Sequence, residues 1–207
     1  MPGTYDDAHD KAVELQAETG MTFIHPYDDE QVIAGQGTIG LEILDQLPDL
    51  DAVIVPVGGG GLISGVAFAI KSLRPEVKIY GVQAAGAPSM EHAFHDHKYE
   101  TLDSAVTFAD GIASRRPARR RSTWSASTWT RIVTVSEDEI AAAILALMEN
   151  QKLVAEGAGA TPVAAALFGK LPLAGKKTGL PDFRRQHRRE HSVPRHHPRP
   201  RHERPQS

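Results

Sequence analysis

The stretch "AVIVPVGGGGLISG", residues 52–65, constrains the fold of this chain more than any other. Residues 52–57 form a continuous apolar and β-branched run, which is typical of a strand buried on both faces of a parallel sheet. Four glycines follow at 58–61, and residues 62–72 have the apolar spacing of a helix. The sequence therefore predicts a strand, a tight turn without side chains, and a helix that begins at the turn.

Helical and strand patterns alternate on both sides of this unit. The predicted helices cover 4–19 (with Thr4 as its N-cap), 39–47, 62–72 and 88–96; the predicted strands cover 21–24, 52–57, 78–83 and 131–135; a loop is expected at 25–37. This order favours an α/β fold, an open parallel sheet with flanking helices. Ligands of such sheets bind beyond the carboxyl ends of the strands, so the loops that start at His25 and Gly58 are expected on the ligand side.

A further helix has one of the clearest starts in the chain. Ser136 and Glu139 form a capping box, and Val135 and Ile140 are placed as a hydrophobic staple. We expect its buried stripe to consist of Ile140, Ile144, Leu145 and Met148.

Composition excludes several kinds of chemistry. The 207 residues include no cysteine, which rules out disulfides, thiolate metal sites and a cysteine nucleophile. No apolar run approaches the roughly 18 residues of a membrane span, and the amino end lacks a secretory pattern. We expect a cytoplasmic protein without a membrane partner.

Three interpretations of the glycine turn involve a bound phosphate. A P-loop needs Lys and Ser or Thr after the last glycine, but Leu62 and Ile63 stand there. The dinucleotide fingerprint fits no register, and the next strand ends in Gln83 rather than an acid. A small phosphate monoester cofactor remains, with a tight turn that holds no ligand as the alternative.

Five longer segments resemble one family. "PYDDEQVIAGQGTIGLEIL", "VIVPVGGGGLISGVAFAIKSLRP", "FADGIA", "VTVSEDEI" and "VAEGAGATPVAAAL" are similar to the second half of the threonine dehydratase (threonine ammonia-lyase) family. These are fold-type II pyridoxal-phosphate enzymes, related to the tryptophan synthase β chain. The resemblance covers residues 1–178, which we interpret as part of a catalytic domain, and is broken between about 118 and 130.

The resemblance implies a cofactor site and a reaction. Gly58, Gly59, Gly60, Gly61 and Leu62 would cradle the phosphate of pyridoxal 5'-phosphate. The implied reaction is β-elimination of L-threonine to 2-oxobutanoate and ammonia, in isoleucine biosynthesis or threonine catabolism, with L-serine as a possible second substrate. Serine dehydratases and serine racemases share the glycine loop and remain alternatives. The family also implies a homo-oligomer and no nucleic-acid partner.

The resemblance also exposes two absences. The family's anchor lysine, which is also its general base, lies upstream in a Ser-x-Lys context, and none of the eight lysines here (11, 71, 78, 98, 152, 170, 176 and 177) has it. We therefore assign no catalytic residue and expect the isolated chain to be inactive; a non-catalytic phosphate-binding or interaction remnant is the alternative. Gln83 stands where some eukaryotic relatives carry a glutamate for a divalent cation, so we assign no metal.

Two segments have sequences that suggest a shift in the reading frame of the gene. With suitable codon choices, a shifted frame translates the codons of 121–129 as Phe-Asp-Leu-Val-Ser-Lys-Tyr-Leu-Asp. A shifted frame can likewise translate the codons of 183–188 as Ser-Gly-Gly-Asn-Ile-Asp. The serine of the second segment would match the serine that contacts the pyridine nitrogen in the family. Residues 181–207 hold eight Arg, five His and three acids, so we expect 179–207 to be a disordered or frameshifted tail. A metal-binding or polyanion-binding arm is the alternative.

Four other positions carry weaker expectations. Glu156 is expected to start a helix. Asp110 and Gly111 form a turn that the family places near the cofactor. His25 and Tyr27 either touch substrate or pack the loop.

Overall fold

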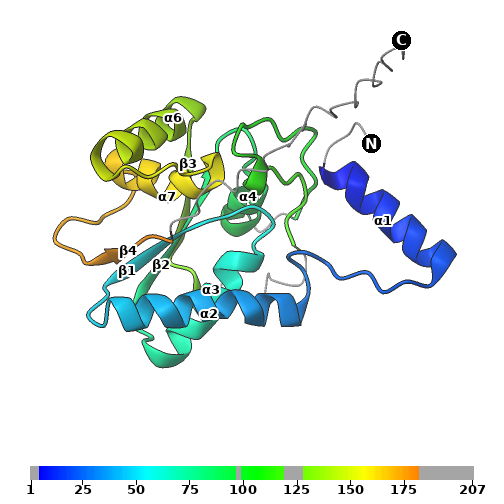
Figure 1. Ribbon diagram of the computed structural model, residues 1–207, viewed down its shortest axis with the longest axis horizontal. Coiled ribbons are helices and arrows are strands. Elements are labelled where there is room, and N and C mark those ends of the chain that lie inside the picture. Colours follow the sequence, from blue (N-terminus) through cyan, green and yellow to red (C-terminus); the bar gives the residue numbers. More distant parts are fainter. Residues whose placement is uncertain (1–4, 97–98, 119–127, 182–207) are drawn as a thin grey trace, which may run out of the picture.

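The computed structural model describes residues 5–96, 99–118 and 128–181 and has an α/β architecture (Figure 1). Its sheet contains β1 (Ala52–Pro56), β2 (Lys78–Ala84), β3 (Arg131–Val135) and the short β4 (Thr178–Gly179). The strands are all parallel, in the order β3-β2-β1-β4. The predicted open parallel sheet is confirmed.

Helices cover both faces of the sheet. One face carries α3 (Gly61–Leu73) and α4 (Ser89–Asp96), with α2 (Glu30–Gln46) packed on α3; the other carries α6 (Glu137–Ala146) and α7 (Gly157–Leu167). Because side chains alternate along a strand, Val53 and Val55 enter the core beneath α3, whereas Ile54 enters the core beneath α7. This two-sided burial explains why β1 is apolar at every position.

Helices α2 and α3 approach each other unusually closely. A Cβ atom placed on Gly65 would lie 2.2 Å from the carbonyl oxygen of Ile33 and 2.8 Å from the backbone nitrogen of Gly37. On Gly40 it would lie 2.9 Å from the carbonyl oxygen of Val66. Gly40 and Gly65 therefore serve backbone-to-backbone packing between the two helices.

Three expectations from the sequence are wrong. Residues 21–24 are not a strand, because none of the described strands runs beside them; Met21 and Ile24 are exposed instead. The loop expected at 25–37 ends early, because Asp29 caps α2 by accepting hydrogen bonds from the backbone N–H groups of Gln31 and Val32.

The third error concerns α6. Its capping box forms as predicted, and Ile140 is buried, but Leu145 and Met148 are exposed. Ile144 packs against the core as predicted, together with Ala143 and Leu147, and a π-helical turn at Leu147–Gln151 then changes the helical phase.

The amino-terminal helix α1 (Tyr5–Thr19) stands beside the rest of the molecule (Figure 1). Its predicted position is confirmed for the described residues, but its apolar face is not buried: Asp6 is its only buried residue, and Leu15 is exposed. We call residues 5–28 the arm. Among the described residues, no helix is long and apolar enough to span a bilayer.

Candidate functional site

A pocket of about 350 Å³ opens at the carboxyl end of β1. All five residues predicted to bind the cofactor line it, namely Gly58, Gly59, Gly60, Gly61 and Leu62. The opposite walls come from Tyr5 and Tyr27 of the arm and from Gly111 and Glu156. The fold thus brings the predicted site residues together at the edge of the sheet where ligands of parallel α/β folds bind.

Each glycine of the turn has its own reason to lack a side chain. A Cβ on Gly59 would lie 2.2 Å from the ring of Tyr27, and one on Gly61 would lie 2.8 Å from the Cβ of Tyr27. A Cβ on Gly58 would lie 3.1 Å from the Cα of Ile112, and Gly60 has a φ of 96°, which favours glycine. Close protein neighbours and a left-handed backbone therefore account for all four.

The backbone N–H groups of the turn distinguish an anion site from a plain turn. Gly60 is the N-cap of α3, and because it has no side chain, no side-chain group caps the helix. The backbone N–H groups of residues 58–62 donate no hydrogen bond to another described residue. The carbonyl groups are engaged, since Gly59 accepts from the N–H of Ala118 and Gly58 accepts from Gln83. Free donors at the positive end of a helix dipole suit a phosphate, so the residues present fit the cofactor that the resemblance implies.

Tyr27 forms the wall that faces the glycines. Its ring contacts Tyr5 with ring centroids 5.9 Å apart, and its hydroxyl lies 3.5 Å from the Ser114 hydroxyl. Burial raises the pKa of Tyr27, so its phenol stays neutral at physiological pH. His25 instead holds the backbone of residues 25–28: its Nδ1 accepts hydrogen bonds from the N–H groups of Tyr27 and Asp28, at 3.3 and 2.9 Å.

Glu156 contributes the carboxyl group of the pocket. It is the N-cap of α7, as predicted, yet its side chain makes no capping hydrogen bond. Burial, and then the nearby carboxylate of Asp110, raise the pKa of Glu156. Asp110 begins the short 3-10 turn Asp110–Ile112 and accepts a hydrogen bond from the Gly111 N–H, so the predicted turn is confirmed.

Gln83 holds the glycine turn from behind. The side chain is fully buried; its Nε2 donates to the Gly58 carbonyl at 3.3 Å, and its Oε1 accepts from the N–H groups of Met90 and Glu91 at 3.0 and 2.7 Å. One amide therefore caps α4 and positions the turn. Among the described residues no group of side chains suited to a metal ion is found.

Sequence reasoning assigned no role in the site to six residues that line the pocket: Tyr5, Pro26, Gln36, Pro56, Ile112 and Ala158. Gln36 was assigned to a loop, although Asp29 followed by an acidic residue was a readable helix start. Tyr5 lines the pocket only because the arm folds back towards the glycine turn. No local sequence pattern indicates this fold-back.

Much of the two segments interpreted as frameshifted lies outside the described residues. Of 121–129 only Thr128 and Trp129 are described, and 183–188 falls entirely outside, as does the tail from 182. Trp129 is buried and stacks on Phe94 with ring centroids 6.1 Å apart.

Comparison with known proteins places these features in one class. Residues 1–180 match the family described as "Pyridoxal-phosphate dependent enzyme". The chain therefore belongs to the pyridoxal-phosphate dependent enzymes, a family that includes lyases such as L-threonine ammonia-lyase. The resemblance seen in the sequence is confirmed.

Two curated relatives are named for L-threonine. Over 176 residues the chain is 50% identical to L-threonine ammonia-lyase of Thermotoga maritima, a match covering 85% of this chain and 44% of that one. It is 47% identical over 167 residues to the catabolic L-threonine dehydratase TdcB of Escherichia coli, covering 81% of this chain and 51% of that one. The chain spans about half the length of the curated relatives it matches.

Solved structures agree on the fold. Threonine deaminase isoform 2 from Solanum lycopersicum superposes with a TM-score of 0.78 and 38% identity, covering 86% of this chain and 52% of that one. Serine racemase from Dictyostelium discoideum gives a TM-score of 0.77 and 32% identity, covering 88% of this chain and 59% of that one.

Proposed function

We propose that this chain is the phosphate-binding part of a pyridoxal-phosphate dependent ammonia-lyase that acts on L-threonine. The observation that carries the proposal is the pocket in which free N–H groups at the start of α3 meet a half-buried carboxyl group and a tyrosine ring. Threonine is favoured over serine because, among the solved structures, a threonine deaminase is 38% identical and a serine racemase 32%, and a curated relative named for threonine reaches 50%.

The roles of the chain's own residues follow from their positions. The N–H groups of 58–62 hold the phosphate, Tyr27 excludes water from one side, and Glu156 presents a carboxyl group whose pKa is raised. When bound, pyridoxal phosphate takes up the electrons left by removal of the amino acid's Cα proton. The lysine that anchors the cofactor is supplied by sequence outside this chain, whose described pocket contains no lysine.

A binding experiment tests the phosphate site without a lysine. The probe is pyridoxine 5'-phosphate, which has no aldehyde and so cannot react with surface lysines; pyridoxine is its matched control. Equilibrium dialysis should show binding of the phosphate ester, displaced by inorganic phosphate, and no comparable binding of pyridoxine.

Two variants locate the binding. Leu62→Pro removes one N–H donor in the first turn of α3, where proline is tolerated, and Leu62→Ala removes the same side chain but keeps the donor. A hydrogen bond to a charged group contributes about 1.5–3 kcal/mol, so Leu62→Pro should weaken binding roughly 10-fold to 100-fold relative to Leu62→Ala. Equal affinities in the two variants, with circular dichroism showing both folded, would contradict the proposed site.

A further inference from the structure

The arm reaches the glycine turn through a short bend, residues 25–28, that lies between α1 and α2 (Figure 1). Tyr27 is the residue of this bend that touches the turn. A Cβ on Gly59 would lie 2.2 Å from its ring, and one on Gly61 would lie 2.8 Å from its backbone carbonyl oxygen. Whatever fixes the bend therefore also fixes this wall of the cofactor pocket.

One side-chain atom holds two backbone groups of the bend. The Nδ1 atom of His25 accepts hydrogen bonds from the N–H groups of Tyr27 and Asp28, at 3.3 and 2.9 Å. An imidazole accepts at Nδ1 only while it is neutral and carries its proton on Nε2. The bend in this structure therefore requires a neutral His25.

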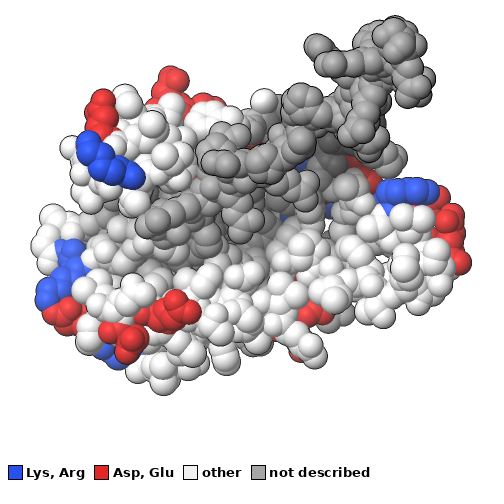
Figure 2. Space-filling view, viewed as in Figure 1, with Lys and Arg blue, Asp and Glu red and all other residues white. Residues whose placement is uncertain are grey.

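Aromatic rings surround this imidazole. Its ring centroid lies 4.6 Å from that of Tyr27, 5.1 Å from that of His9 and 6.0 Å from that of Phe23. Figure 2 shows acidic and basic side chains gathered at the outer edge of α1, whereas the contact of His9 with His25 lies on the side of α1 that faces the bend. Histidine is the side chain whose charge ordinarily changes between about pH 5 and 8, so two groups of this ring cluster titrate there.

Charged groups reach the imidazole from two elements. On α1, the carboxylate of Asp10 lies 3.2 Å from Nδ1 of His9 and also pairs with Arg116 at 2.7 Å. This carboxylate is therefore already engaged by two partners on the α1 side.

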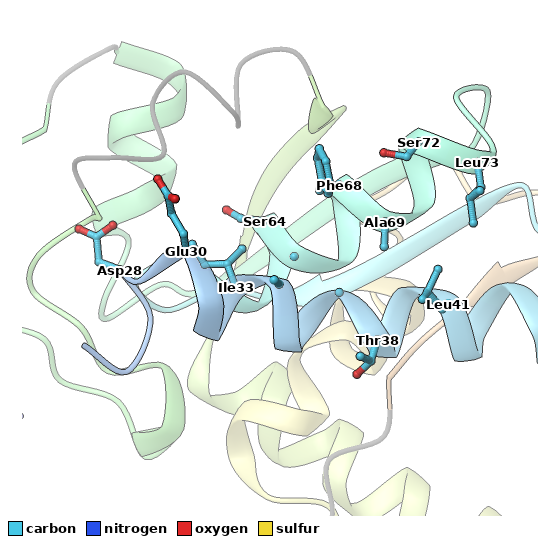
Figure 3. A pocket seen from close by; sticks show the side chains of 13 residues that line it. Asp28, Glu30, Ile33, Thr38, Leu41, Ser64, Phe68, Ala69, Ser72 and Leu73 are labelled. Carbon is cyan, nitrogen blue, oxygen red and sulfur yellow. The ribbon is translucent and has the colours of Figure 1, made fainter. Parts of the chain in front are cut away.

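The start of α2 supplies the larger share of negative charge. His25 lines a cavity of about 500 Å³ together with Asp28, Asp29 and Glu30. Asp28 and Glu30 both lie at the beginning of α2 (Figure 3). Three carboxylates attract an imidazolium towards this cavity, and a protonated Nδ1 no longer accepts from the backbone of the bend.

We propose that His25 is a positioning residue of the cofactor pocket, whose neutral imidazole holds Tyr27 against the glycine turn and whose protonation releases it. The added proton takes the Nδ1 lone pair that accepts the two backbone hydrogen bonds, and no covalent bond between heavy atoms changes. Affinity for a phosphate-bearing cofactor then falls as the pH drops from 8 to 5.5. This inference rests on the proposed function, because it names what keeps one wall of the same pocket in place.

Three variants separate the acceptor from the charge. His25→Asn keeps an acceptor, because the amide oxygen takes the place of Nδ1, but it does not titrate. His25→Leu has neither the acceptor nor the charge. His9→Phe keeps the ring contacts of α1 and removes the neighbouring imidazole, so it assigns the pH dependence to one histidine or the other.

The first readout is equilibrium dialysis with pyridoxine 5'-phosphate at pH 8 and pH 5.5. A phosphate monoester itself gains a proton near about pH 6, so each variant is compared with the wild type at the same pH. His25→Asn should bind like the wild type at pH 8 and about ten-fold more tightly than the wild type at pH 5.5, the size expected for losing two modest hydrogen bonds. His25→Leu should bind about ten-fold more weakly at pH 8, and His9→Phe should follow the wild type at both pH values.

The second readout needs no ligand. Solvent-exchange NMR gives the protection of the Tyr27 and Asp28 amide protons after correction for the intrinsic exchange rate at each pH. In the wild type this protection should fall about ten-fold between pH 8 and pH 5.5, while amides of β1 keep theirs. In His25→Asn it should not change with pH.

The outcomes separate this inference from the proposed function. Equal pH dependence in His25→Asn and the wild type, wild-type affinity of a folded His25→Leu, or loss of the pH dependence in His9→Phe would each overturn the role of His25. A wild-type chain that fails to bind pyridoxine 5'-phosphate at pH 8 contradicts the proposed function instead. The amide protection of Tyr27 and Asp28 still decides in that case whether His25 holds the bend.

Discussion

The sheet with its covering helices and the arm are held by different kinds of contact. Around β1 both faces are packed with apolar side chains, and even the helix backbones touch. Within the arm the rings of Tyr5 and Tyr27 contact each other, and ion pairs from Arg116 to Asp6 and Asp10 tie the arm to the rest of the molecule, while Val13, Leu15 and Met21 remain exposed. The pocket lies between these two regions, so one of its walls is rigid and the other is held mainly by polar groups.

The largest expected effect is on the rigid side, for Gly65→Ala. The added Cβ would lie 2.2 Å from the Ile33 carbonyl oxygen, and two backbones must separate to admit it. We expect a loss of roughly 3 kcal/mol or more in the free energy of unfolding, measured by urea denaturation.

Gly35→Ala is the matched control in the partner helix. A Cβ there meets nothing within 4 Å, so the variant should be more stable by roughly 0.5–1 kcal/mol. Equal stability of the two variants would show that the helices are not packed as closely as described.

Local signals made the rigid region predictable. The strand, the glycine turn, the following helix and the capping box at Ser136 each depend on residues adjacent in sequence, and all were predicted correctly. The residues 21–24 were mistaken for a strand because a strand needs a neighbour, which a sequence pattern does not supply. The contact of Tyr27 with Gly59 likewise joins segments about thirty residues apart.

A smaller effect is expected where the rigid region meets the pocket, for Gln83→Met. Methionine is similar in length, so the change removes hydrogen bonds while filling most of the same volume. The buried N–H groups of Met90 and Glu91 would lose their acceptor, and an unsatisfied buried group costs about 1–3 kcal/mol.

The same variant should weaken the phosphate site. The Gly58 carbonyl loses its donor, so the turn is less well positioned and pyridoxine 5'-phosphate should bind less tightly. Thermal unfolding and equilibrium dialysis measure the two effects. Lower stability with unchanged affinity would show that Gln83 supports α4 but not the turn.

The smallest effect on global stability, and the most local one, is expected in the arm. Hydrogen bonds from Arg116, and then from His9, lower the pKa of Asp10 from 3.8 to about 2. A carboxyl group whose pKa is lower in the folded state stabilises the folded state at pH values above its unfolded-state pKa. This stabilisation is lost as the pH falls through its folded-state pKa. Attachment of α1 through Asp10 should therefore be complete above about pH 4 and be lost as the pH approaches 2.

Arg116→Gln should reproduce that loss at neutral pH. We expect the amide protons of α1 to exchange faster while those of β1 and β2 keep their protection, because Arg116 pairs with residues of α1, the exposed Asp10 and the buried Asp6, and the sheet does not depend on these pairs. Hydrogen exchange read by mass spectrometry resolves the two regions. If the sheet loses protection together with α1, the arm and the sheet unfold as one unit, and Tyr27 is then as firmly fixed over the glycine turn as the core beneath it.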